Sequence, residues 1–220
     1  MSSLPAIRPV DEQELTPTTP EEIVLRGLTL PVTIRPQRPL SDQELLVFCA
    51  ANDGRDIESD SDGSIRVMTP AKSKTSLLNA ILVGQFVVWS QRTGKGVVFG
   101  PDHGVRFEDR TLRAPDASWL SNDEWSRAQE EEQANPGFLH FCPKFIVELR
   151  SQTDRASQIE AKMEFWMSRG AELGWLIDPI RKLAMIYRPG QEPETLLQPE
   201  ALTGEGPIEG FRIDMRPFWS

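Results

Sequence analysis

A chain of 220 residues is long enough for one ordinary domain with extensions, or for two small domains at most. Apolar residues make up 39% of the sequence, which supplies a hydrophobic core and excludes wholesale disorder. The formal net charge of −9 gives an acidic surface that repels phosphate, so the chain is not a general nucleic-acid coating protein. Any contact with nucleic acid must therefore be confined to a local cleft, with a metal ion screening the charge.

Cysteines, histidines and apolar runs exclude several other classes. The two cysteines, Cys49 and Cys142, form no CxxC pair, so the sequence supports neither a zinc ribbon nor a disulfide scaffold. The two histidines, His103 and His140, lie far apart, which excludes a histidine-rich metal site and an HExxH helix. The first residues have neither a basic start nor an apolar run, and the most apolar stretch, 81–89, is too short to span a bilayer. We therefore expect a cytoplasmic protein with no membrane partner.

Residues 1–40 are predicted to form an extended N-terminal arm, because they hold seven of the 18 prolines. An apolar patch lies within this arm and consists of Ile23, Val24, Leu28, Leu30 and Val32. Ser41 and Glu44 then form a capping box, which predicts a helix that begins here and ends at residues 52–54. Two short extended runs, 55–58 and 64–68, flank Asp62-Gly63 and predict a β-hairpin.

The middle of the chain predicts a long helix followed by strands. From Ser73 to Arg92 the inward-facing positions recur at helical spacing. These positions are Leu77, Leu78, Ile81, Leu82, Gln85, Phe86 and Trp89. Strands are predicted at 97–99, 105–107 and 112–119, and a polar, exposed helix at 123–133.

The run 144–149 is almost continuously apolar, which is typical of a strand that is covered on both faces. A helix at 154–169 and a strand at 175–178 follow, so this part of the chain predicts a strand–helix–strand crossover. Further strands are predicted at 183–187 and, more weakly, at 194–197 and 211–215. The elements together predict an α/β fold of mixed α+β character, in which helices flank both sides of a mixed central β-sheet.

Two carboxylates stand in strand-like runs. Glu148 lies inside the apolar run, where a charge is costly unless something binds it, although it could instead be solvated at the strand end or paired with Arg150. Asp116 follows Pro115, and most Pro-Asp pairs are turns. Asp116 gains weight as a functional residue because Glu148 is expected in a neighbouring strand.

Lys162 is the third candidate. On a helix with about 100° per residue, Lys162 falls between Phe165 and Trp166, inside the buried arc that Ile159 and Met163 complete. Its ammonium group could reach water past a packed stem, or it could point at the carboxylates of the preceding strand.

Two carboxylates and a lysine form a set that suits metal-assisted phosphodiester hydrolysis. Oxygen ligands hold Mg²⁺ octahedrally and leave positions for water and phosphate. The metal lowers the pKa of its bound water and offsets negative charge in the transition state, and a nearby cation helps either step.

The order of motifs resembles the PD-(D/E)XK nuclease superfamily and, within it, the bacterial Uma-two (Uma2) family. The matching segments span residues 40–190 and are 57–65, 115–119, 146–154, 162–163 and 174–179. The resemblance implies a restriction-endonuclease-like core in a domain at 41–190, with residues 191–220 as a C-terminal extension packed on the same domain. It also implies a metal-binding set of Asp116, Glu148, Glu58 and Leu149. Lys162 occupies the lysine position of the family, while Arg150 stands where the wider superfamily usually has its lysine.

These observations lead to one main functional hypothesis and one alternative. The main hypothesis is an endonuclease that depends on Mg²⁺, with Mn²⁺ as a substitute, and that hydrolyses DNA with Asp116, Glu148, Lys162, Glu58 and Arg150 in its active site. The alternative is a catalytically weak or inactive module with a nuclease fold that binds nucleic acid or protein. The acidic charge and Arg150, which cannot carry a proton, favour this alternative. A homodimer is possible, because two-fold dimers are common and a duplex cutter needs two sites.

Overall fold

The computed structural model describes residues 30–134 and 137–220 and divides into two units, Met1–Thr69 and Pro70–Ser220. The boundary between the two units along the sequence therefore lies near residue 70. The domain limits drawn at residues 40 and 190 stay predictions. Most of the predicted N-terminal arm, including Ile23, Val24 and Leu28, lies outside the described residues. Within its last part the structure has a strand that the prolines did not suggest, β1 (Val32–Ile34).

In the first unit, helix α1 (Asp42–Ala51) begins as its capping box predicts. Ser41 Oγ accepts a hydrogen bond from the Glu44 backbone N–H, and the Glu44 carboxylate accepts one from the Ser41 backbone N–H at 2.9 Å. The predicted hairpin is confirmed as the antiparallel pair β2 (Asp56–Ser59) and β3 (Ile65–Met68), and β1 pairs with the other edge of β3. The left-handed backbone of Gly63, with φ +86°, makes the tight turn between β2 and β3 possible.

The second unit is built on a six-stranded sheet in the order β11-β10-β9-β8-β7-β4. The strands are β4 (Val97–Phe99), β7 (Ala117–Leu120), β8 (Phe145–Leu149), β9 (Leu173–Asp178), β10 (Leu183–Tyr187) and β11 (Glu194–Leu197). β8 and β9 are parallel, and the other neighbouring strands are antiparallel. The predicted mixed sheet and the crossover are therefore confirmed.

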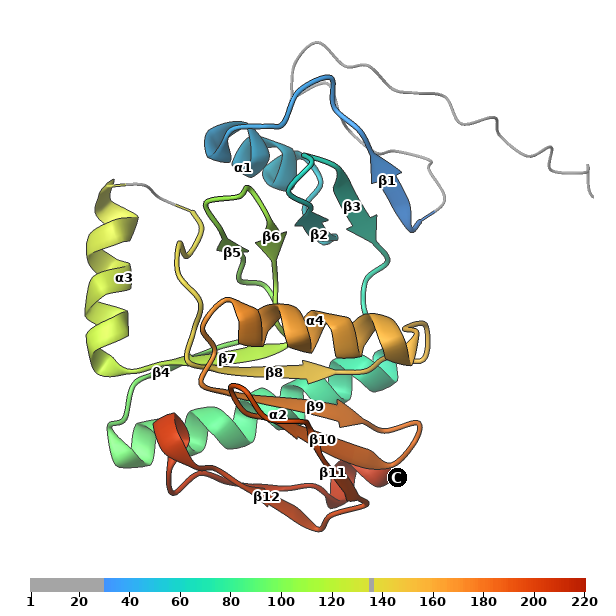
Figure 1. The fold of residues 1–220 in the computed structure, drawn as a ribbon, viewed down its shortest axis with the longest axis vertical. Coiled ribbons are helices and arrows are strands. Elements are labelled where there is room, and N and C mark those ends of the chain that lie inside the picture. The colour runs from blue at the N-terminus through green and yellow to red at the C-terminus, as the bar shows by residue number, and fades with distance from the viewer. Residues whose placement is uncertain (1–29, 135–136) are drawn as a thin grey trace, which may run out of the picture. The chain divides into compact units, whose positions relative to one another are not determined.

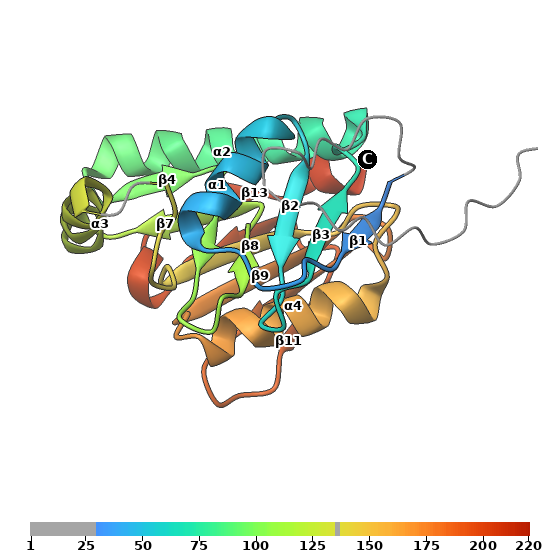
Figure 2. The same cartoon turned by 90° about the horizontal axis from the view of Figure 1, so that it is seen from above.

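Two helices cover opposite faces of this sheet, α2 (Ser73–Thr93) on one side and α4 (Ala156–Ser168) on the other (Figures 1 and 2). The alternation of side chains along β8 explains this arrangement, because Val147 packs into the cluster that contains α2, and Ile146 into the cluster that contains α4. One position on α2 was assigned wrongly: Leu77 was expected on the inner face but is 60% exposed. The polar helix α3 (Asn122–Ala134) is present where the sequence predicts it.

The predicted strand 112–119 is wrong as a single element. The structure has β6 (Leu112–Arg113), which forms a hairpin with β5 (Val105–Arg106), and a separate strand β7 that joins the central sheet. Pro115 lies between β6 and β7 and has no N–H group for a sheet hydrogen bond, which explains the interruption. The break leaves Asp116 at the entrance of β7.

The C-terminal residues belong to the second unit and pack into the same hydrophobic cluster as α2. They form the two-stranded sheet of β12 (Ala201–Thr203) and β13 (Arg212–Asp214) and the 3₁₀ segments Gly206–Ile208 and Arg216–Trp219. Phe211 stacks on Phe86 and Trp175, with ring centroids 4.5 and 5.8 Å away. Among the helices of the described residues, none has the length and apolar character that crossing a membrane requires.

His103 lies in the loop between β4 and β5 and is expected to make stability depend on pH. Its ring stacks on Phe99 at 4.7 Å, and neither ring nitrogen has a hydrogen-bond partner in the part of the chain that the structure describes. Burial lowers the pKa of His103 from 6.5 to about 4. The unfolded chain therefore binds a proton more readily than the folded chain between these two values, so the free energy of unfolding falls as the pH falls from 6.5 towards 4.

The size of this effect is up to roughly 3 kcal/mol, at about 1.4 kcal/mol per pKa unit. Urea unfolding of wild type and His103→Phe between pH 7.5 and pH 4.5 measures it. The difference in unfolding free energy between the two proteins should shift in favour of the variant as the pH falls. A difference in unfolding free energy between wild type and His103→Phe that stays constant over this pH range would contradict the prediction.

Candidate active site

The pairing of β7 with β8 brings the two predicted carboxylates together. Ala117 pairs with Val147 at the end of this antiparallel ladder, and Asp116 and Glu148 are the next residues of the two chain segments. Glu148 is only 1% exposed, so it is a buried carboxylate and not a solvated residue at the end of a strand.

Asp116 is fixed by two hydrogen bonds from neighbouring elements. Its Oδ2 accepts from the Leu149 backbone N–H at 2.7 Å, and its Oδ1 accepts from the side-chain amide of Asn79 on α2 at 3.2 Å. Burial raises the pKa of Asp116, and the positive charge of Lys162 and the hydrogen bond from Leu149 only partly oppose this effect. Because the Leu149 side chain is apolar, Leu149 can contribute to a polar site only through its backbone, and its N–H already binds Asp116.

Glu148 projects towards α4, where two side chains meet the same carboxylate oxygen. Its Oε1 accepts a hydrogen bond from the indole N–H of Trp166 at 2.7 Å and lies 3.2 Å from Lys162 Nζ. The Lys162 ammonium also donates to the Ala114 carbonyl at 2.7 Å. Lys162 is thus directed at the carboxylate of the preceding strand, as the helical spacing suggested, and its ammonium is held by protein groups.

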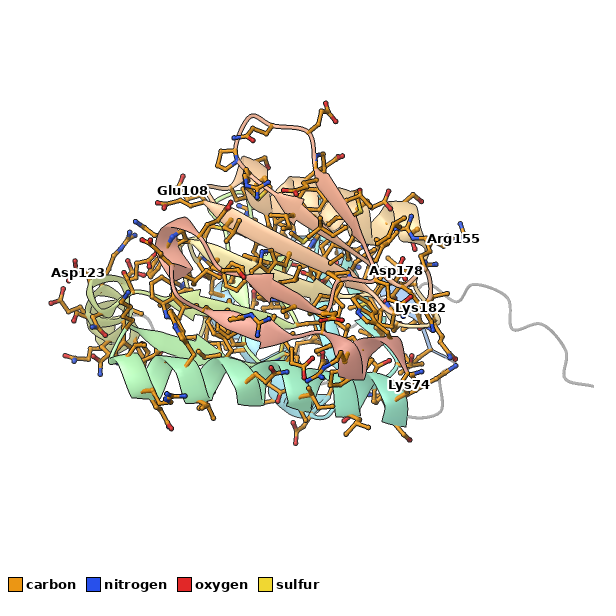
Figure 3. The ribbon with its side chains drawn as sticks, turned by 90° about the horizontal axis from the view of Figure 1, so that it is seen from below. Lys74, Glu108, Asp123, Arg155, Asp178 and Lys182 are labelled. Atoms are coloured by element: carbon orange, nitrogen blue, oxygen red, sulfur yellow. The ribbon has the colours of Figure 1, made fainter. Side chains whose placement is uncertain are left out.

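The side chain of Arg150 binds Asp178 and Asp154, whereas the side chain of Glu148 binds residues of α4. Its guanidinium donates to Asp178 Oδ2 at 2.9 Å and to the Asp154 carbonyl at 3.1 and 3.2 Å. Asp178 is fully buried at the end of β9, where Arg181 also contacts it at 2.5 Å. Figure 3 shows Asp178 at the same end of the unit as Arg155 and Lys182. Burial would raise the pKa of Asp178, but the hydrogen bonds from Arg181 and Arg150 outweigh it and lower the pKa below its usual value.

Glu58 belongs to the first unit, where it is buried on β2. Its Oε2 lies 3.0 Å from a guanidinium nitrogen of Arg66, the residue opposite it on β3. Its role as a third acidic ligand stays a prediction.

The donor set of Asp116 and Glu148 suits a small hard cation. Mg²⁺ is commonly held by one or two carboxylates, with water and substrate oxygens completing the shell. Two carboxylates on the residues that follow the last pair of one ladder supply such oxygen ligands. Within residues 30–134 and 137–220, no group of three or more His, Cys, Asp or Glu side chains is close enough to hold a metal ion.

The sequence did not predict that two further side chains, Trp166 and Asn79, would bind the carboxylates of the site. Trp166 was assigned to the core, and the helical spacing does predict its burial, but spacing alone does not show where a ring N–H points. Asn79 gave a clearer signal, because it is an amide between the buried residues Leu78 and Leu82 of α2. A buried amide requires a polar partner, and here that partner is Asp116.

Comparisons with known proteins agree with this architecture. The crystal structure of a putative nuclease belonging to DUF820 from Anabaena variabilis ATCC 29413 superposes with a TM-score of 0.62 and 22% sequence identity, over 74% of this chain and 89% of that chain. This likeness confirms the predicted fold class. No curated protein sequence matches the chain. The model of the Uma2 family, described as "Putative restriction endonuclease", matches residues 42–216. This match covers well over half of the sequence, and the chain therefore belongs to the Uma2 family of restriction-endonuclease-type hydrolases.

Proposed function

We propose that the protein is a Mg²⁺-dependent endonuclease that hydrolyses phosphodiester bonds of DNA by means of a metal-activated water, with Mn²⁺ as a substitute. The observation that carries this proposal is the pair of Asp116, directly before β7, and the buried Glu148 on β8, which follow the last residue pair of the β7–β8 ladder, with the Lys162 ammonium 3.2 Å from Glu148. Membership of a restriction endonuclease family supports the reaction class.

Each residue of the site has a distinct task in this proposal. Asp116 and Glu148 would hold the cation, which supplies a water of lowered pKa and positive charge next to the phosphate. Hydrogen bonds from Leu149 and Asn79 orient the Asp116 carboxylate before any substrate binds. Lys162 balances the buried charge of Glu148 and can donate a hydrogen bond to an oxygen of the scissile phosphate. Arg150 is bound to Asp178 and contributes to the scaffold.

Asp116→Asn tests the function most directly. The variant keeps the shape of the side chain but removes the negative charge, so DNA cleavage should fall by about 10²–10³-fold, because a lost cation ligand costs several kcal/mol of transition-state stabilisation. Plasmid and single-stranded DNA are incubated with Mg²⁺ or Mn²⁺, and Asp123→Asn, on the exposed start of α3, is the matched control. Absence of cleavage by wild type under all these conditions, or equal cleavage by Asp116→Asn, would overturn the proposal.

Nucleic acid as the substrate is supported by an arginine–phenylalanine cluster beside the site. The cluster consists of Arg113, Arg169, Phe107 and Phe165. The Phe165 ring has the Arg113 guanidinium at 5.3 Å and that of Arg169 at 4.9 Å, and Arg169 also lies 5.0 Å from the Phe107 ring. Phe165 follows Lys162 by three residues on α4, so both side chains are on one helix face. Two guanidinium groups gathered here, in a chain of net charge −9, suit an approaching phosphate chain.

Arg169→Gln is therefore expected to weaken DNA binding about tenfold and to reduce the salt dependence by about one phosphate contact. Fluorescence anisotropy of a labelled duplex in EDTA, at several salt concentrations, measures binding without cleavage. Arg169 lies over its rings and pairs with Asp109. Arg127→Gln is the matched control, because Arg127 likewise lies over a ring, Phe141 at 4.3 Å, and pairs with an acid, Glu131. Equal affinities and salt slopes for the two variants would contradict a role of the cluster in binding.

One observation favours the alternative of an inactive binding module. Both oxygens of Asp116 already accept hydrogen bonds, so a cation must compete with Leu149 and Asn79 for them. Calorimetry with Mn²⁺ separates the two functions: an active nuclease binds the ion at this site, whereas a binding module takes up DNA or protein and no Mn²⁺. The homodimer and the cytoplasmic location stay predictions.

A further inference from the structure

The Trp166 indole is the neutral partner of Glu148, and its setting is rigid. Its N–H donates to Glu148 Oε1 at 2.7 Å, and the side chain is fully buried. The ring packs against Phe165 and Phe107, with centroids 5.5 and 6.1 Å away. A packed ring has no freedom to turn its N–H elsewhere, whereas Lys162 has four flexible methylene groups and already shares its ammonium with the Ala114 carbonyl.

Trp166 and Lys162 are four residues apart on α4, so one helix face presents both donors to the same oxygen. Two contacts on Oε1 fix the rotation of the carboxyl group, and they therefore fix the direction in which Oε2 points. The contribution of Trp166 carries no charge, so it leaves the full negative charge of Glu148 for a cation.

A second tryptophan shows that packing alone does not explain this hydrogen bond. Trp175 on β9 is also fully buried, yet its indole N–H has no hydrogen-bond partner among the described residues. The fold thus accepts a buried indole without a partner at one position, while at the other the indole N–H is aimed at the carboxylate of the candidate site.

We propose that Trp166 is a positioning residue that holds the Glu148 carboxylate in its metal-binding orientation while Lys162 turns from Glu148 to the phosphate. This proposal rests on the proposed function and extends it. Because Trp166 is fully buried, it acts on the substrate only through Glu148. Its loss should therefore lower the metal affinity and kcat, and it should leave the KM for DNA unchanged.

The test compares Trp166→Phe with Trp175→Phe, since both changes remove an indole from a fully buried position and only the first removes a hydrogen bond to Glu148. Trp166→Phe is expected to lower the Mn²⁺ affinity, measured by calorimetry, and kcat by about 10–100-fold, as is usual when a partner of a metal ligand is removed. Trp175→Phe should match wild type per folded molecule, with the folded fraction taken from circular dichroism.

A spectroscopic measurement tests the contact without any metal or activity. The six tryptophans give indole N–H signals in a ¹H–¹⁵N spectrum, and the two Phe variants assign the signals of Trp166 and Trp175. Glu148→Gln replaces a charged acceptor by a weaker neutral one, so the Trp166 signal should move upfield while the Trp175 signal changes little. If Trp166→Phe does not fold, one of the five indole signals that remain after the Trp175 signal is assigned should still move upfield in Glu148→Gln, and no such movement would contradict the contact.

The outcomes separate the two proposals. Equal Mn²⁺ affinity and kcat in the two Phe variants, or a Trp166 signal that does not shift in Glu148→Gln, would overturn the positioning role. Neither result would contradict the proposed nuclease function. A wild-type protein that binds Mn²⁺ but cuts no DNA would contradict the proposed hydrolysis. Loss of Mn²⁺ affinity in Trp166→Phe alone would still support the positioning role in that case.

Discussion

Lys162→Met should destabilise the fold by about 3–5 kcal/mol and remove cleavage, because it removes the ammonium group that lies 3.2 Å from a buried carboxylate. Glu148 is 1% exposed, and the Trp166 indole that remains bound to it is neutral. Methionine has nearly the length of the lysine stem, so the packing against α4 changes little and the lost charge dominates. Urea unfolding at neutral pH measures the stability, and plasmid cleavage with Mg²⁺ measures the activity.

The double variant Lys162→Met/Glu148→Gln separates stability from catalysis. With the charge of Glu148 also removed, most of the lost stability should return, since replacing both members of a buried pair is often neutral. Cleavage should not return, because the variant lacks both the Glu148 carboxylate and the Lys162 ammonium group. If the double variant is as unstable as Lys162→Met, the charge balance between the two residues is not the cause of the loss.

Asp178→Ala is expected to cost about 3–5 kcal/mol, because it leaves Arg150 without its acidic partner in a largely buried position. Asp178 is fully buried, and the side chain of Arg150 is 14% exposed. Arg181 also loses a contact, but it keeps Glu160 at 2.7 Å and reaches solvent. Asp178→Leu/Arg150→Met should recover much of the stability, and its cleavage per folded molecule should stay close to that of wild type if Arg150 belongs to the scaffold.

Asp178 also predicts how stability depends on acid. Its folded pKa lies below the unfolded value of 3.8, so its contribution is fully present above 3.8 and is lost as the pH falls through the folded pKa. Asp178→Ala should therefore flatten the acidic part of the stability curve, below the unfolded pKa of 3.8, relative to wild type. If the free energy of unfolding depends on pH below 3.8 in the same way in Asp178→Ala and in wild type, the arginine contacts of Asp178 contribute little to stability in solution.

The sequence reveals most of the architecture because its strongest signals are local or periodic. The continuous apolar run around Glu148 predicted a strand covered on both faces, and the spacing along α4 placed Lys162 on the side that faces it. The break at Pro115 was missed, since the apolar pattern continues across a residue that cannot donate to a ladder. The partners Trp166 and Asn79 were also missed, because periodicity predicts which residues are buried but not which polar atoms meet.

The long sequence separations within the site make it a property of the completed fold. Asp116 and the Leu149 N–H are 33 residues apart, and Lys162 and the Ala114 carbonyl are 48 residues apart. The contact of Lys162 cannot form in a nascent chain that has not yet reached α4. Release of α4 from the sheet would remove Lys162 and Trp166 from Glu148 at once, even with the strands still paired. The candidate site is thus complete only when α4 is packed on the sheet, and a ligand that detaches α4 would change the surroundings of Glu148 without touching Glu148 itself.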